Sequence, residues 1–106
     1  MNVVVLVDSL LRRTYPTDLV AQVGGEKVFQ FLTEDPFYIS LRREGVSVVR
    51  GRAPTADVEV EGPSSVVEDV VQGKVSPVDA VLSGALKVRG DLAAAGRLAS
   101  VVRRVM

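Results

Sequence analysis

The side chains that could do chemistry in this 106-residue chain are carboxylates, amines, guanidinium groups and hydroxyls, because it has no histidine and no cysteine. A Ser-His-Asp triad, a Cys-His pair and a cysteine zinc site are therefore excluded. The closest approach to an acid–base pair is Glu59 and Glu61, which point outward from a predicted strand, opposite Lys87 and Arg89. Cross-strand ion pairing explains these carboxylates better than catalysis does. We therefore expect a protein that is not an enzyme and that uses no cofactor and no metal.

Two other patterns look functional but have simpler structural explanations. Arg89-Gly90-Asp91 spells an integrin-binding tripeptide, yet it also serves as a strand end, a turn glycine and a helix cap. The arginines around the second and third predicted strands (Arg42, Arg43, Arg50 and Arg52) are explained best as solvated charges at a sheet edge. The alternative is contact with lipid head groups, so a transient contact with a membrane surface stays open.

Length and composition indicate one globular domain over residues 1–106, with 47% hydrophobic residues. Thirteen basic residues balance thirteen acidic ones, so we expect no binding to nucleic acid. The first residues, MNVVVLVDSLL, lack the basic region and the cleavage site of a signal peptide. No apolar run approaches the roughly 18 residues that span a bilayer. We expect a cytoplasmic protein.

Helical spacing of apolar residues appears near the start of the chain. We expect a first helix over residues 3–15, capped by Asn2 and stopped by Pro16. A second helix should follow over residues 17–23, with Thr17 as its cap and Gly24 past its end.

Three more helices are predicted after residue 62. The first has a capping box formed by Ser65 and Glu68, and the second is a short helix between Ser76 and Gly84. Asp91 caps the last helix. Its apolar stripe consists of Leu92, Ala95, Leu98, Ala99 and Val102.

Alternation of apolar and polar residues predicts strands over residues 28–32, 37–41, 46–49, 57–61 and 86–89. Glu44-Gly45 should form a hairpin turn in which Gly45 takes a positive φ. One sheet face should carry Phe29, Phe31, Phe37, Ile39, Leu41, Val46, Val48, Val58 and Val60. Gln30, Tyr38, Ser40, Arg42, Ser47, Glu59 and Glu61 should face solvent. Helices packed on one face of such a sheet make an α+β fold.

The apolar face of the sheet and the apolar stripes of the amphipathic helices face each other. They could form an ordinary filled core, or a hollow one that holds an apolar ligand. Periodicity alone does not separate these two possibilities.

An ordered set of short motifs accompanies these elements. It comprises Glu44-Gly45, Ala56-Asp57-Val58, Gly73-Lys74, Pro77-Val78-Asp79-Ala80, the stretch Ser83-Gly84-Ala85-Leu86-Lys87-Val88, Gly90-Asp91 and Leu98. In order and spacing the set resembles the sterol carrier protein type-2 family of lipid-binding domains, over about residues 26–102. The N-terminal helix is also similar to that of related accessory domains in bacterial ubiquinone synthesis.

The resemblance implies a five-stranded, mostly antiparallel mixed sheet, covered on one face by short helices that enclose an apolar tunnel. The implied function is carriage of an apolar lipid: a fatty acid, a fatty acyl thioester, an isoprenoid or a sterol. Val81 and Leu82 stand where better-known members carry bulkier Phe and Met. This departure favours an acyl chain or an isoprenoid over cholesterol.

For such a ligand we predict a pocket between the last two helices and the sheet. Its predicted lining is Phe29, Phe31, Ile39, Val78, Val81, Leu82, Leu86, Leu98 and Val102, with the short helix after Ser76 as its gate. Two alternatives remain: a ligand-free accessory module that binds a partner helix or forms a homodimer, and an acyl-thioester hydrolase.

Overall fold

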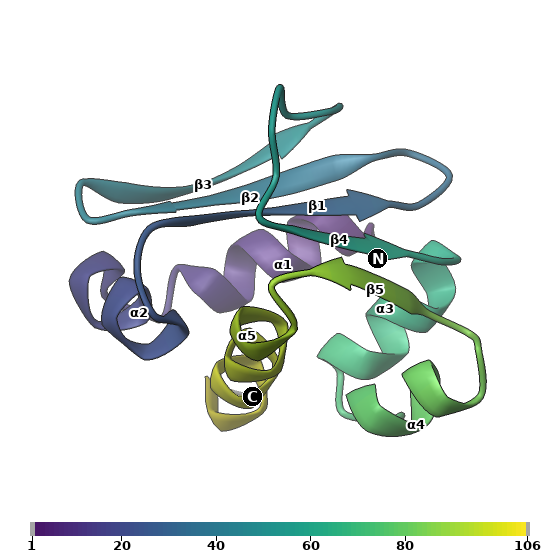
Figure 1. The fold of residues 1–106 in the computed structure, drawn as a ribbon. Helices are drawn as coiled ribbons and strands as arrows, with labels where there is room; N and C mark the ends of the chain where they lie inside the picture. The colour runs from purple at the N-terminus through teal and green to yellow at the C-terminus, as the bar shows by residue number, and fades with distance from the viewer. Residues whose placement is uncertain (1, 106) are drawn as a thin grey trace.

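One mixed sheet of five strands organises the chain, and the helices lie on the same side of it (Figure 1). The structure is a computed structural model that describes residues 2–105. The strands are β1 (Lys27–Leu32), β2 (Phe37–Arg42), β3 (Gly45–Arg50), β4 (Val58–Glu61) and β5 (Lys87–Gly90). Their order is β3-β2-β1-β4-β5; β1 and β4 run parallel, and the other neighbours are antiparallel. The predicted α+β class with a mixed five-stranded sheet is confirmed.

The strand register places the apolar residues on the face that the helices cover. Phe29 lies between Ile39 and Val58, and each of the three is at most 2% exposed. Leu41 is also buried. Phe31, Val46, Val48 and Val60 are partly buried against the same core. The predicted register is confirmed, since a slip of one residue would have turned these side chains outward.

The turn between β2 and β3 differs from the prediction. Arg43 and Glu44 make the connection, and Gly45 already pairs with Arg42 as the first residue of β3. Gly45 is not among the glycines with positive φ. The predicted role of Gly45 is wrong because a paired strand residue has an extended backbone.

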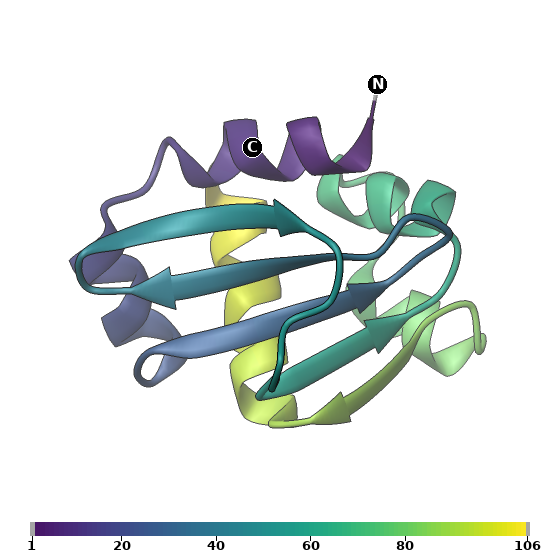
Figure 2. The ribbon, with the colours of Figure 1, turned by 90° about the horizontal axis from the view of Figure 1, so that it is seen from above.

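The helices are α1 (Val3–Leu11), α2 (Pro16–Val23), α3 (Ser64–Val71), α4 (Pro77–Leu82) and α5 (Leu92–Val105). Figure 2 shows α5 crossing beneath the sheet, while α1 runs along the β3 edge. The first two helices pack against β2 and β3 and bury Leu10, Leu11, Leu19 and Val20 there. Within residues 2–105, no helix is both long and apolar enough to cross a membrane.

Two predicted helix boundaries near the N-terminus are wrong. Asn2 does cap α1, but the helix ends at Leu11, where the Thr14 hydroxyl donates to the Leu11 carbonyl at 2.6 Å. Pro16 does not stop this helix; it begins α2 instead, because a first-turn residue needs no backbone N–H. Thr17 therefore lies inside α2 and does not cap it. Gly24 ends α2 with a φ of 94°, as predicted.

The start of α5 also departs from the predicted stripe. Asp91 caps the helix, since its Oδ1 accepts the Ala94 N–H at 3.0 Å. Leu92 is 62% exposed, however, and the buried residues of α5 are Ala94, Leu98 and Val101. The buried stripe is therefore rotated from the predicted one, because α5 packs against α2 as well as the sheet.

Asp57 joins three segments where β4 begins. Its backbone N–H donates to the Val28 carbonyl at 2.9 Å, and its carboxylate accepts the Val28 N–H at 2.7 Å. Its carbonyl accepts the Asp91 N–H at 2.9 Å. A Cβ on Gly90 would lie 2.3 Å from that carbonyl oxygen, and Gly90 has a φ of 96°, so this position requires glycine. These hydrogen bonds of Asp57 hold β4 beside β1 and position the first residues of α5.

Gln30 was predicted to face solvent but is only 3% exposed. Residues 51–57 pass over the outer sheet face on their way from β3 to β4 and cover Gln30 (Figure 1). The Gln30 Nε2 donates to the carbonyls of Phe37 at 3.0 Å and Gly51 at 3.1 Å, and the Gln30 Oε1 accepts the Ala53 N–H at 2.8 Å. The side chain thus fastens the crossing segment to the sheet.

We expect Gln30→Ala to lower the free energy of unfolding by about 1–3 kcal/mol, because it leaves buried backbone groups without partners. Urea unfolding monitored by circular dichroism measures the change. Gln72→Ala is the control, since Gln72 is exposed after α3 and should change stability by no more than about 0.5 kcal/mol. Equal effects of the two substitutions would contradict the role assigned to Gln30.

Candidate functional site

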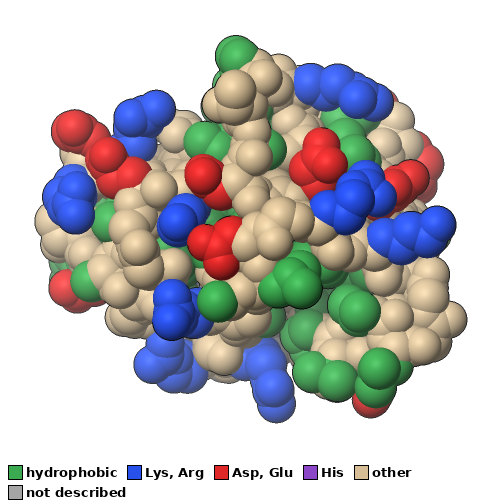
Figure 3. All heavy atoms as spheres, in the orientation of Figure 1, with side chains coloured by type: hydrophobic (Ala, Val, Ile, Leu, Met, Phe, Trp, Pro, Cys, Tyr) green, Lys and Arg blue, Asp and Glu red, His purple; other side chains and the backbone are tan. Residues whose placement is uncertain are grey.

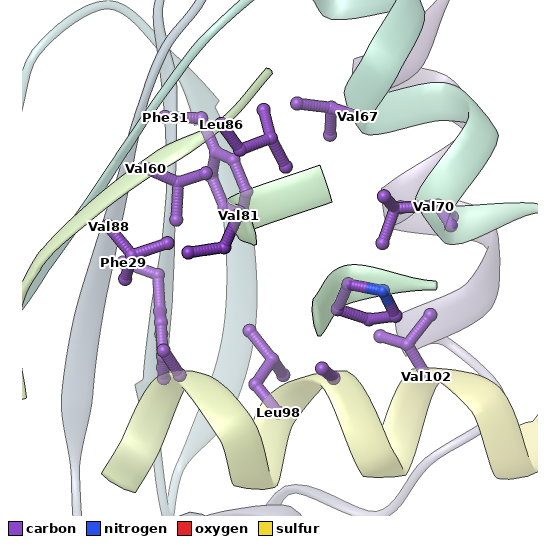
Figure 4. A pocket seen from close by; sticks show the side chains of 14 residues that line it. Phe29, Phe31, Val60, Val67, Val70, Val81, Leu86, Val88, Leu98 and Val102 are labelled. Carbon is purple, nitrogen blue, oxygen red and sulfur yellow. The ribbon is translucent and has the colours of Figure 1, made fainter. Parts of the chain in front are cut away.

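An apolar pocket lies between the sheet and helices α3, α4 and α5 (Figure 4). Its volume is about 120 Å³. Every residue that lines it is apolar. The sheet side supplies Phe29, Phe31, Val60, Leu86 and Val88; the helices supply Val67, Val70 and Val71 (α3), Pro77 and Val81 (α4), and Ala95, Leu98, Ala99 and Val102 (α5).

Strand pairing brings the sheet side of the lining together. Phe31 pairs with Val60 across the parallel β1–β4 ladder, and Val60 pairs with Val88 on β5. The Phe31 ring stacks on Phe37, with centroids 4.7 Å apart and planes 4° from parallel. The pocket therefore has a continuous apolar wall made from three neighbouring strands.

The outer face of the same strands is polar. Arg89 lies opposite Glu59, and its guanidinium contacts Glu59 at 3.3 Å and Glu61 at 3.0 Å. Hydrogen bonds to Glu61 and then Glu59 raise the pKa of Arg89 further. The predicted cross-strand ion pairing is confirmed for Arg89. These carboxylates lie on the face of the sheet away from the pocket.

Two carboxylates hold the helices that form the far wall. The Ser65–Glu68 capping box is not formed; α3 begins after Pro63, and Glu34 from the β1–β2 loop accepts the Ser64 N–H at 2.8 Å. That backbone hydrogen bond lowers the pKa of Glu34. At α5, the hydrogen bond from the Ala94 N–H, followed by the contact with Lys27 at 3.2 Å, lowers the pKa of Asp91.

Helix α4 is the least anchored wall of the pocket. It has six residues, of which Ala80 is the buried one, and its main packing partner among the helices and strands is α3. Gly73 and Gly84 flank it with φ of 77° and 81°. Val81 lines the pocket and is also 45% exposed, so the pocket reaches the surface at α4.

The structure brings six of the nine predicted lining residues together around the pocket: Phe29, Phe31, Val81, Leu86, Leu98 and Val102. Ile39, Val78 and Leu82 do not line it. Ile39 is buried on β2, in the half of the sheet beneath α1 and α2. Val78 and Leu82 are 64% and 79% exposed, because the two turns of α4 direct only Pro77 and Val81 toward the pocket.

Eight lining residues were not predicted: Val60, Val67, Val70, Val71, Pro77, Val88, Ala95 and Ala99. Most belong to inward-facing stripes that the sequence pattern identifies, but a stripe does not show where atoms are missing. The available signal is the small size of Ala95 and Ala99 on the inner side of α5. Alanines facing phenylalanine and valine leave space that a leucine would fill.

The lining determines what the pocket can hold. It presents no side-chain hydrogen-bonding group, so a polar or charged group placed inside would lose its water without compensation. An apolar cavity of about 150 Å³ accepts a benzene-sized molecule. The pocket in its present shape accommodates a group of that order, and a longer chain requires the walls to move. Among residues 2–105, no group of three or more acidic side chains is placed to hold a metal ion.

The sequence model of the SCP-2 sterol transfer family matches residues 7–103. No curated protein sequence matches the chain. The fold is similar to that of the ubiquinone synthesis protein UbiJ-SCP2, with a TM-score of 0.76 and 19% identity over 98% of this chain and 96% of the other.

Two further solved structures share the fold. Palmitated SCP2L2 from Aedes aegypti gives a TM-score of 0.62 and 21% identity, over 91% of this chain and 93% of the other. The sec-alkylsulfatase Pisa1 from Pseudomonas sp. gives a TM-score of 0.70 and 19% identity over 89% of this chain. The chain spans only 14% of the length of that sulfatase.

The two capping carboxylates predict how stability depends on pH. Because the folded-state pKa of Glu34 and of Asp91 is lowered, each carboxyl stabilises the fold above its unfolded pKa of about 4 and loses this effect as the pH falls through its folded pKa. We expect Asp91→Asn and Glu34→Gln to be less stable than the parent at pH 7 and to lose less stability on acidification.

Urea unfolding at several pH values from neutral to acidic measures this effect. Glu44→Gln, in the exposed β2–β3 turn, is the matched control for charge removal. A parent and an Asp91→Asn variant with the same dependence of stability on pH would contradict the capping role of Asp91.

Proposed function

Because the chain belongs to the SCP-2 sterol transfer family, we propose that it binds a single-chain apolar lipid in the pocket between the sheet and α3–α5, and carries it without chemical change. The observation that supports this most directly is the lining of the pocket, which consists entirely of apolar side chains. Such a lining favours hydrocarbon and disfavours any reaction that needs a positioned acid, base or nucleophile.

The polar end of the ligand should remain at the surface. No lining side chain can satisfy a carboxylate or a thioester carbonyl, so the hydrocarbon tail enters first and the head group stays in water. A fatty acid, a fatty acyl thioester or an isoprenoid can bind in this way. A flexible chain also suits a pocket that must be enlarged, because it can occupy an irregular space in steps that a rigid sterol ring system cannot follow.

Enlargement of the pocket is assigned to α4. A helix of six residues is too short to be stable without tertiary contacts, and α4 buries little of its own surface. Its flanking glycines, Gly73 and Gly84, allow it to move as a unit away from α5 and Leu86. The palmitated relative of the same fold supports a long-chain ligand as the first to test.

A second candidate is a ligand-free accessory module. The similarity to UbiJ-SCP2 over nearly the full length of both chains favours it, as does the small volume of the pocket. In that case the apolar pocket between the sheet and α3–α5 would receive a side of a partner helix or of a second copy. Catalysis by an acyl-thioester hydrolase has less support, since the carboxylates of Glu59 and Glu61 pair with Arg89 on the opposite face of the sheet.

Filling the pocket tests carriage directly. Ala99→Phe places a ring in the space between α5 and the sheet, so it should lower the affinity for a fluorescent long-chain fatty acid at least about tenfold while the fold is retained. Fluorescence titration measures binding, and circular dichroism measures folding. Ala93→Phe is the matched control, because Ala93 is exposed on the opposite side of the same helix.

The milder variant Ala99→Leu serves if the phenylalanine is too large to fold. A parent that binds no probe, together with an Ala99→Leu variant of raised melting temperature, would show that the pocket is only a packing gap. A parent that is dimeric and free of lipid in native mass spectrometry would favour the accessory module.

The proposed movement of α4 predicts its hydrogen exchange. We expect the amides of Ala80 in α4 and of Ser83 at its C-cap to exchange faster than amides in the middle of α5, because local opening of a short helix costs little free energy. Addition of the fatty acid should slow exchange in α4 more than in α1, which lies against the other half of the sheet. Uniform slowing across all helices would contradict a localised opening.

A further inference from the structure

The two edges of the sheet differ in how they are protected against pairing with another chain. β5, at one edge, has only four residues, and two of them, Lys87 and Arg89, are charged. Figure 3 shows acidic and basic side chains close together over β4 and β5. Just before β5, the Leu86 N–H donates to the Ala80 carbonyl of α4 at 3.0 Å. A short strand, charged side chains and a covering contact all discourage the addition of a further strand.

β3, at the opposite edge, lacks these protections along most of its length. Residues 45–49 read Gly-Val-Ser-Val-Val and include no charged residue and no proline. The register with β2 is unbroken from Gly45 to Arg50, so no bulge turns this edge away. Charged side chains stand only at the ends of β3, with Arg43 and Glu44 in the turn before it and Arg50 as its last residue. An unprotected edge of this kind is a site for strand pairing.

The backbone of β3 directs its hydrogen-bonding groups alternately to the two sides of the strand. Hydrogen-bonded pairs alternate along an antiparallel ladder, and just beyond β3 the Gly51 N–H donates to the Pro36 carbonyl at 2.7 Å. By this parity Ser47 bonds to β2, while the N–H and C=O groups of Val46 and Val48 point away from the sheet. No other segment of the described part of the chain bonds to these outward groups. Such a row of donors and acceptors matches the backbone of an extended chain.

Helix α1 runs alongside this edge, outside β3 (Figure 2). A hollow lies near each end of β3 on its α1 side. The hollow near the start of β3 has a volume of about 130 Å³ and is lined by Asp8, Leu11, Arg12, Thr14, Pro16 and Val46. The hollow at the end of β3 has a volume of about 140 Å³ and is lined by Asn2, Val3, Val4, Thr33, Glu34, Asp35, Arg50, Ser64 and Glu68. A strand added to β3 would direct alternate side chains toward these hollows.

The position of α1 argues against a second copy of the chain at this edge. A two-fold pairing of β3 with its copy would set the two strands about 4.7–4.9 Å apart. Because α1 lies outside β3, the α1 helices of both copies would then occupy the same strip beneath the shared edge. Packed helices need about 8–10 Å between their axes. A single extended segment carries no such helix and can lie over α1.

We propose that the open edge of β3 binds an extended segment of a partner protein, which adds to the sheet as an antiparallel sixth strand. Antiparallel pairing is the more stable arrangement per residue. The inward side chains of Val46 and Val48, together with Val4 and Leu11 of α1, favour apolar residues at alternate positions of the segment. The proposal goes beyond carriage, because β3 contributes no residue to the pocket between the sheet and α3–α5.

The test is a fluorescence anisotropy titration with a short fluorescein-labelled peptide in which valine and threonine alternate. In an antiparallel pair, a peptide residue that bonds to Val46 or Val48 has its side chain on the same face of the sheet as that valine. The peptide valines should therefore face α1, and their N–H groups should bond to β3. N-methylation of the peptide valines should weaken binding at least about tenfold, because it removes these donors. N-methylation of as many threonines is the matched control and should change binding by no more than about twofold.

A substitution in β3 tests the same contact from the side of the protein. Val48→Pro removes an N–H that β2 does not use, so the variant should fold, as circular dichroism would confirm, and should bind the peptide at least about tenfold more weakly. Val48→Ala shortens the same side chain but keeps the N–H, so it should bind at least about threefold more tightly than Val48→Pro. Val48 does not line the lipid pocket, so Val48→Pro should still take up a fluorescent fatty acid. This readout separates a failure of strand pairing from a failure of carriage.

Three results would overturn the proposal. The first is a folded parent that does not bind the peptide, and the second is equal affinity for the two N-methylated peptides. The third is a parent that is dimeric in sedimentation velocity and becomes monomeric through Val48→Pro, which would assign the β3 edge to a second copy.

Discussion

The parallel pairing of β1 with β4 is the constraint on which the rest of the structure depends. It places a strand from the second half of the chain next to the first strand, so the chain must cross a face of the sheet after β3, and residues 51–57 cross the outer one. Asp57 holds the start of β4 through its hydrogen bonds with Val28 and Asp91, and Gln30 holds residues 51–57, which cross the sheet. Without this pairing, Val60 would not stand beside Phe31, and the wall of the pocket would be interrupted.

The two halves of the helical layer fill the space against the inner face of the sheet differently. Helices α1 and α2 bury three leucines (Leu10, Leu11 and Leu19) together with valines over β2 and β3, where Ile39 and Leu41 are fully buried. Helices α3 and α5 oppose β1, β4 and β5 with valines, alanines and one leucine, Leu98, and α4 contributes only Pro77 and Val81. Side-chain volume therefore runs short in one half. The pocket results from this imbalance of residue size across a single continuous core.

Local patterns were sufficient to predict the strands, their faces and the approximate positions of the helices. Alternation identified Phe29, Ile39 and Val58 as one face, and the short polar connections kept the register. Predictions that depended on contacts distant in sequence were less accurate. The cap of α3 is Glu34, thirty residues before Ser64, and the burial of Gln30 depends on a loop that begins 21 residues later, at Gly51. Such partners leave no mark in the local pattern.

The candidate site shows the same division. Six predicted lining residues lie around the pocket, because strand parity and the stripe of α5 fix their direction. For α4, periodicity could not decide which side of a two-turn helix faces inward; Val78 and Leu82, predicted to line the pocket, are exposed. That orientation is determined by packing of Ala80 and by the hydrogen bond from the Leu86 N–H to the Ala80 carbonyl at 3.0 Å. An alanine is a weak sequence signal for a buried anchor.

A lining made only of hydrocarbon also limits how selective this protein can be. With no donor or acceptor to recognise a functional group, it can distinguish ligands only by girth and length, and each methylene that fits or fails to fit changes affinity by about 1–3 kcal/mol. Related sequences could therefore acquire new preferences through single exchanges among valine, alanine and leucine at positions such as Val70 or Ala95, with the scaffold unchanged. Chemical diversity of cargo would arise from steric tuning.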